Sequence, residues 1–91
     1  MKLNDFRNEI DALDKEIVEL IVKRMEISKA ISEYKYKHNL PIRDANRESE
    51  LIKNRTEHIE DLALKKALES VFEAILKSSR NVQALVQDEL K

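Results

Sequence analysis

The first 38 residues carry an apolar stripe that is typical of a long amphipathic helix. A helix of about 33 residues would be about 50 Å long, and the rest of a 91-residue chain is too short to cover such a face. We therefore predict that a second copy of the chain covers it. The apolar side chains recur every three or four residues, the spacing of one helix face, at Leu3, Phe6, Ile10, Leu13, Ile17, Leu20, Ile27, Ile31 and Tyr34.

Local signals mark both ends of this first helix. Asn4 or Asp5 is expected to cap its start, because a short polar side chain can accept the first free backbone N–H groups. Asn39 is the residue expected to take a left-handed conformation at its end, since the chain has no glycine. Pro41 then prevents the helix from continuing.

Two further helices are predicted, a short one and a long one. Asp44 is expected to cap the second, which ends at about His58, and Asp61 is expected to cap the third. The predicted fold is therefore all-α, with three helices (long, short, long) in a single domain over residues 1–91. Apolar residues at helical spacing mark the third helix, at Leu64, Leu68, Val71, Phe72, Ile75, Val82 and Val86.

Composition excludes several classes of protein. The chain has 17 Lys and Arg against 18 Asp and Glu, so it has no net positive field with which to bind nucleic acid. It has no cysteine and no glycine, which excludes thiolate sites and glycine-rich phosphate loops. No apolar run suits a membrane span or a leader peptide, so a cytoplasmic location is expected. His38 and His58 are expected in solvent at helix ends, and neither a metal nor a cofactor is predicted.

Cationic side chains interrupt the stripe of the first helix. Arg24 follows Leu20 by four residues, Lys35 follows Ile31 by four, and Arg7 lies beside the same face. One such cation usually extends its charged end to water, or pairs with a glutamate across a dimer seam. Several buried cations without anions would each be costly. They favour a ligand with more than one carboxylate.

The third helix repeats the pattern with neutral polar groups. Ser79 follows Ile75 by four residues and Gln83 follows Ser79 by four, so both are expected to face inward. A serine at such a position is most often a packing residue, and a glutamine can fix the register of a helix. Together with the cations, they favour a polar ligand site.

Arg7 and Arg24 are too far apart to share a small ligand within one chain. They are separated by 17 residues, or about 25 Å along a straight helix. In an antiparallel pair of first helices, Arg7 of one chain approaches Arg24 and Lys35 of the other, so we predict a site shared across a two-fold interface.

The segment between the first two helices adds polar candidates. Capping alone explains Asp44, and the helix dipole favours Glu48 in the first turn but not Arg47. The misplaced arginine is mild support for anion binding, although a solvated helix face explains it nearly as well.

These residues resemble the all-helical class of chorismate mutase over nearly the whole chain. The resemblance implies an intertwined homodimer of three-helix chains that rearranges chorismate to prephenate, on the route to phenylalanine and tyrosine, without a covalent intermediate. The matching positions are Arg7, Leu13-Asp14, Arg24, Lys35, the Pro41–Glu48 segment with Asp44, Arg47 and Glu48, Phe72, Ser79 and Gln83.

The resemblance also implies a role for each site residue. Arg24 and Arg7 of the partner subunit would bind the substrate carboxylates, helped by Arg47 and Ser79. Lys35 would contact a carboxylate and the ether oxygen, and Gln83 would donate a second hydrogen bond to that oxygen. Glu48 and the backbone near Asp44 would hold the ring hydroxyl, with apolar walls from Ile31, Leu51 and Leu76.

Two alternatives stay open at the level of sequence. An isochorismate-pyruvate lyase on the same fold would use a similar basic pocket for a nearly identical dicarboxylate. A non-catalytic helical dimerisation module would need Arg24, Lys35 and Gln83 only for stability.

Overall fold

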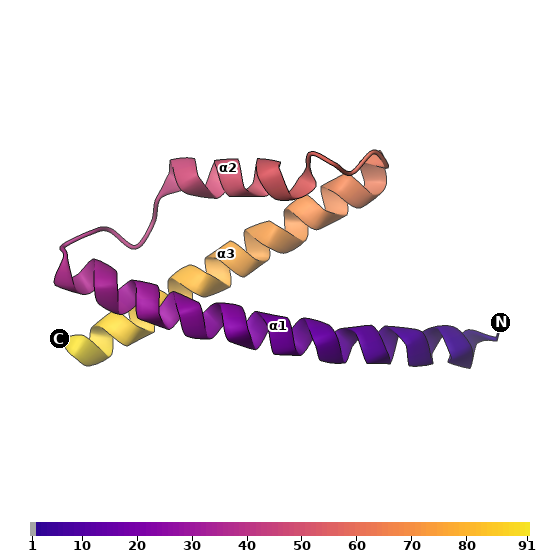
Figure 1. The fold of residues 1–91 in the computed structure, drawn as a ribbon, viewed down its shortest axis with the longest axis horizontal. Coiled ribbons are helices and arrows are strands. Elements are labelled where there is room, and N and C mark those ends of the chain that lie inside the picture. Colours follow the sequence, from indigo (N-terminus) through magenta and orange to yellow (C-terminus); the bar gives the residue numbers. More distant parts are fainter. Residues whose placement is uncertain (1) are drawn as a thin grey trace.

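The computed structural model describes residues 2–91 and confirms the all-α prediction. Helices α1 (Leu3–Lys37), α2 (Ala45–Thr56) and α3 (Leu62–Leu90) follow one another without any strand in the described residues. In Figure 1, α3 begins beside the end of α2, runs back beneath it and then crosses the C-terminal half of α1, while the N-terminal half of α1 extends with no other helix alongside. The order long, short, long is the predicted one.

The starts of α2 and α3 are capped as predicted. The Asp44 carboxylate accepts a hydrogen bond from the backbone N–H of Arg47 at 3.0 Å. The Asp61 carboxylate accepts one from the backbone N–H of Leu64 at 3.1 Å. Helix α2 ends at Thr56 rather than at about His58, because the carbonyl of Thr56 accepts from the N–H of Ile59 at 3.0 Å and turns the chain toward α3.

The prediction for the start of α1 is wrong. Lys2, in an extended conformation, is the capping residue instead of Asn4 or Asp5. Asp5 lies inside the first turn, where its carboxylate accepts the backbone N–H of Lys2 at 2.9 Å. A carboxylate in the third helical position can reach back in this way, so the helix begins earlier than a capping role for Asp5 would allow.

Asn39 ends α1 in the predicted left-handed conformation, with φ of 54°. The N–H of Leu40 bonds to the carbonyl of Lys35 at 2.8 Å, and the N–H of Asn39 bonds to that of Tyr36 at 3.4 Å. This pair of bonds is the Schellman motif, which satisfies the last carbonyls of a helix. It also turns the chain back toward Lys35, whose Nζ contacts the backbone carbonyl of Ile42.

Replacement of Asn39 tests this helix end. Asn39→Ala is expected to lower the free energy of unfolding by about 1 kcal/mol, because a Cβ without a compensating polar group is unfavourable at positive φ. Asn39→Gly is expected to match or slightly exceed the parent. Denaturant titrations at one fixed protein concentration measure both changes. Equal stability of the two variants would contradict a left-handed Asn39.

One chain by itself has almost no apolar core. Its radius of gyration is 16.4 Å, against about 12 Å for a compact domain of this length. Its extents are 54 × 26 × 14 Å, so the helices form a thin layer. Leu51 and Leu76 are the buried apolar side chains in residues 2–91. Burial of this size is too small to offset the conformational entropy of the chain.

The predicted stripe of α1 is left uncovered within the chain. Leu3 and Leu20 keep 62% and 64% of their surface exposed. The other exposed side chains of the stripe are Phe6, Ile10, Leu13, Ile17, Ile27, Ile31 and Tyr34. None of the helices described here combines the length and the apolar character that a membrane crossing requires.

The crossing of α1 and α3 is made by small polar side chains. Ser28 and Ser32 of α1 are 3% and 0% exposed. The Ser28 hydroxyl lies 2.7 Å from that of Ser79, and the Ser32 hydroxyl donates to the backbone carbonyl of Gln83 at 2.7 Å. Small side chains allow the two helices to approach closely, and this approach brings the polar faces of α1 and α3 together.

Candidate functional site

A cleft of about 770 Å³ opens where the C-terminal half of α1, the 38–44 connection, the start of α2 and the C-terminal half of α3 meet. Its size suits a small molecule. The lining consists of Arg24, Ile27, Ser28, Ile31, Lys35, Leu40, Pro41, Ile42, Arg43, Asp44, Ala45, Asn46, Arg47, Glu48, Leu51, Leu76, Ser79, Arg80 and Gln83.

Seven of the eight residues predicted from the sequence line this cleft, namely Arg24, Lys35, Asp44, Arg47, Glu48, Ser79 and Gln83. The three predicted apolar walls, Ile31, Leu51 and Leu76, line it as well. Arg7 is exposed in the second turn of α1 and does not line the cleft of its own chain.

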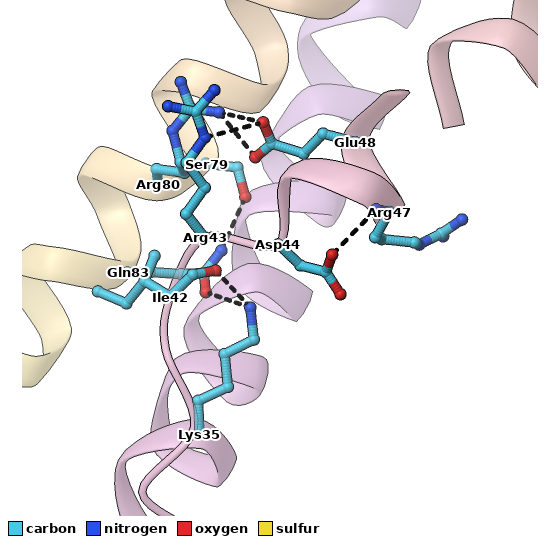
Figure 2. Close-up of polar contacts among 9 residues, drawn as sticks. All are labelled: Lys35, Ile42, Arg43, Asp44, Arg47, Glu48, Ser79, Arg80 and Gln83. Carbon is cyan, nitrogen blue, oxygen red and sulfur yellow. Dashed lines mark hydrogen bonds and ion pairs between the residues drawn. The ribbon is translucent and has the colours of Figure 1, made fainter. Parts of the chain in front are cut away.

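Lys35 is held between the loop and α3, as Figure 2 shows. Its Nζ donates to the backbone carbonyl of Ile42 at 2.6 Å and to Oε1 of Gln83 at 3.4 Å. An ammonium group has three hydrogens, so one remains for a ligand in the cleft. The Schellman turn at Asn39 brings the Ile42 carbonyl back over Lys35, which explains how the loop can orient this side chain.

Gln83 is fixed at both ends of its amide. Its Oε1 accepts from Lys35, and its Nε2 donates to the hydroxyl of Ser79 at 3.2 Å. The side-chain amide nitrogen carries two hydrogens, so one is free to donate into the cleft. Gln83 is 6% exposed, and a buried amide with two fixed partners has little freedom to rotate.

Ser79 supports Gln83 in this arrangement. The Ser28 hydroxyl donates to the carbonyl of Arg24 at 3.1 Å, so the proton between the two serine oxygens, 2.7 Å apart, belongs to Ser79. Ser79 thus donates to Ser28 and accepts from Gln83. Its predicted contact with a substrate carboxylate requires the hydroxyl to turn away from Ser28, and that role stays a prediction.

Glu48 has a partner that the sequence analysis missed. Nη1 of Arg80 contacts both carboxylate oxygens of Glu48, at 2.6 and 2.7 Å, and Nε of Arg43 lies 3.8 Å from one of them. Arg80 follows Leu76 by four residues and precedes Gln83 by three, so its position on the inward face of α3 was a signal available from the spacing.

Asp44 and Arg47 differ in their orientation. The Asp44 carboxylate is engaged in the cap of α2. The Arg47 side chain is exposed and, in Figure 2, points away from Lys35, Gln83 and Glu48. A contact between Arg47 and a ligand therefore requires a change of rotamer, which an exposed arginine makes readily.

The charge of the lining favours an anionic ligand. It contains five cationic side chains, Arg24, Lys35, Arg43, Arg47 and Arg80, against the carboxylates Asp44 and Glu48. Both carboxylates already have partners, in the cap and in the ion pair with Arg80. No cluster of His, Cys, Asp or Glu that could hold a metal ion occurs within residues 2–91.

The fold and this lining define an all-helical protein with a preformed pocket suited to a small, multiply charged anion. The chorismate mutase type II family model matches residues 6–84. The chain belongs to this family.

The curated relatives are longer proteins. A "Bifunctional chorismate mutase/prephenate dehydratase" of Buchnera aphidicola is 45% identical over 75 residues, which is 81% of this chain and 20% of the relative. A "T-protein" of Haemophilus influenzae is 40% identical over 53 residues, 58% of this chain and 14% of that protein. A "T-protein" of Enterobacter agglomerans is 30% identical over 79 residues, 86% and 21% of the two chains. The chain thus spans about a fifth or less of their lengths. No solved structure matches it significantly.

Proposed function

We propose that this chain catalyses the rearrangement of chorismate to prephenate. The observation that carries the proposal is the pair Lys35 and Gln83 in a cationic cleft, where Nζ of Lys35 lies 3.4 Å from Oε1 of Gln83. The Lys35 ammonium and the Gln83 amide nitrogen each have one hydrogen left to donate to a ligand. Membership of the chorismate mutase type II family supports it. Two adjacent donors in a site partly shielded from water can stabilise an oxygen that gains negative charge as a reaction proceeds.

The proposed reaction breaks the ether C–O bond while a C–C bond forms within the same molecule. No nucleophile is required, so the chain has to hold the substrate in a compact conformation and stabilise the developing charge. Lys35 and Gln83 would donate to the ether oxygen. The apolar side chains Ile31, Leu51 and Leu76 would exclude water and strengthen these interactions.

The cationic side chains would bind the two substrate carboxylates. Arg24 lines the cleft of its own chain, and Arg47 would also contact a carboxylate after a rotamer change. We propose that Arg7 of the partner subunit adds a further cation to the site, since Arg7 does not line the cleft of its own chain. Arginine suits this role because its planar guanidinium can bond to both oxygens of a carboxylate.

Incubation with two substrates tests the proposed reaction. With chorismate, prephenate is expected to form. With isochorismate, salicylate and pyruvate are not expected. The reverse pattern would identify the lyase on the same fold. Binding of neither substrate, together with no thermal stabilisation by a dicarboxylate mimic of the transition state, would favour the non-catalytic dimerisation module, because only a native state that binds the mimic is stabilised by it.

We also propose that the chain is an obligate homodimer with two shared sites. The exposed stripe from Leu3 to Leu20 and the nearly absent core support this assembly. Sedimentation is expected to detect only dimer at micromolar concentration, with loss of helix on dilution, because an uncovered chain buries too little apolar surface to fold alone. A folded and active monomer would contradict the proposal. The assignment of residues 1–91 to one domain and a cytoplasmic location stay predictions from the sequence.

A further inference from the structure

The ion pair between α2 and α3 is closely made and partly shielded from solvent. One nitrogen of Arg80 bridges both oxygens of Glu48 at 2.6 and 2.7 Å. The two side chains are only 26% and 18% exposed, so water screens the pair less than it screens an ion pair on the open surface. Figure 2 shows Arg80 and Arg43 on the same side of Glu48. Each of these residues belongs to the cleft lining.

A carboxylate in a pocket that binds anions is unfavourable unless it makes a specific contact with another group of the ligand. Without a cation beside it, Glu48 would repel the carboxylates of a ligand. An ionised carboxylate can only accept hydrogen bonds, so the ligand group that it meets must be a donor. On a dicarboxylate that lacks nitrogen, that donor is a hydroxyl.

We propose that Arg80 is a positioning residue that aims Glu48 at a hydroxyl group of the substrate. The proposal rests on the proposed function and adds to it a residue outside the set predicted from the sequence. Arg80 occupies one lone pair on each oxygen of Glu48. A carboxylate offers about four such positions, so the others stay available to the ligand. The same contact offsets the negative charge of Glu48 beside an anionic substrate.

Selectivity for the hydroxyl therefore depends on Arg80. With Arg80 present, the Glu48 carboxylate has a fixed direction and its bond to the hydroxyl is formed at little entropic cost. Without Arg80, the carboxylate is free to turn toward Arg43, whose Nε already lies 3.8 Å from it. The pocket would then still bind a dicarboxylate through its other cations, but would no longer distinguish a ligand with the hydroxyl from one without it.

The test compares two probes by calorimetry on the full chain, a bicyclic ether dicarboxylate that mimics the transition state and the same compound without its ring hydroxyl. The parent is expected to bind the hydroxylated probe about ten- to hundredfold more tightly, the usual range for a hydrogen bond to a charged group. In Arg80→Met the ratio is expected to fall to about threefold or less. Arg80→Lys, which keeps the charge but loses the planar guanidinium, is expected to lie between them.

Matched controls separate positioning from a general structural effect. Lys77→Met removes an exposed cation from the same helix outside the cleft lining and is expected to keep the parent ratio. Glu48→Gln is expected to lower the ratio as Arg80→Met does, and it provides the same comparison if Arg80→Met does not fold, with Arg80→Lys then reporting on Arg80 itself.

The outcomes are distinguishable. If Arg80→Met or Arg80→Lys weakens both probes equally and keeps the parent ratio, Arg80 contacts the ligand or only stabilises the fold, and the positioning role is overturned while the proposed function stands. If the parent binds neither probe, the proposed function itself fails, and the positioning role fails with it.

Discussion

A mixture of Arg7→Ala and Arg24→Ala chains is expected to be active although each variant alone is inactive. In the proposed dimer, each site takes Arg24 from one chain and Arg7 from the other. Each single variant lacks one substrate-binding arginine at both sites, and the expected loss in kcat/KM is at least about a hundredfold. A mixed dimer has one site with both arginines and one site with neither. Random exchange of equal amounts would restore about a quarter of the parent activity, because half of the dimers are mixed and each has one intact site.

The measurement is kcat/KM after the two variants have been mixed, mildly denatured and refolded together. Mass spectrometry of differently tagged chains establishes that mixed dimers have formed. The matched control is a mixture of Arg7→Ala with a second Arg7→Ala preparation, which is expected to stay inactive. If proven mixed dimers are as inactive as their parents, Arg7 does not cross the interface, and the site has to be completed in another way.

Gln83→Glu is expected to lower kcat/KM at neutral pH by about two to three orders of magnitude, as for the loss of one donor to a developing oxyanion. The side chain keeps its shape, but an ionised carboxylate cannot donate and would face an electron-rich oxygen. It would also lose the hydrogen bond that Nε2 donates to Ser79 at 3.2 Å. As the pH falls and the introduced carboxyl becomes protonated, it can donate again, so the activity of the variant is expected to rise toward acid. The amide of the parent does not titrate in this range.

The pH profiles of parent and variant are measured over the range in which circular dichroism shows both to be folded. Gln87→Glu is the matched control, because Gln87 lies one turn further along α3, donates to the carbonyl of Ser32 at 3.3 Å and does not line the cleft. It is expected to keep the parent profile. Full activity of Gln83→Glu at pH 8 would show that Gln83 is a packing residue, and its role toward the ether oxygen would have to be abandoned.

The features of the fold that depend on neighbouring residues could be predicted from the sequence. Asp44 and Asp61 cap their helices because each accepts an N–H three residues on, and Asn39 takes positive φ because no glycine is available. The start of α1 was predicted wrongly for an equally local reason. Asp5 can serve either as a capping residue or, from inside the first turn, as an acceptor for the N–H of Lys2, and sequence spacing does not distinguish the two.

The features that depend on contacts between helices were harder to predict. The apolar period identified Ile27 and Ile31 on α1, yet the face that packs on α3 is formed by Ser28 and Ser32. Periodicity shows which face is apolar, but it does not show which face meets the same chain and which meets another molecule.

The ion pair between Arg80 and Glu48 was missed for a related reason. The two residues are 32 positions apart and meet only because α2 packs against α3. Sequence spacing placed Glu48 in the first turn of its helix and Ser79 and Gln83 on the inward face of the next. The spacing from Leu76 and to Gln83 places Arg80 on the same inward face, but it does not show that Arg80 meets Glu48 of α2.

Consumption of chorismate by the purified protein tests the central claim most directly. Loss of chorismate and appearance of prephenate are followed together, with Arg24→Ala as the control for background rearrangement in buffer. The expected result is a loss that is proportional to protein concentration and equal to the prephenate formed, while Arg24→Ala stays close to the rate without protein. Chorismate that disappears in the presence of the parent no faster than in buffer alone would contradict the proposed function.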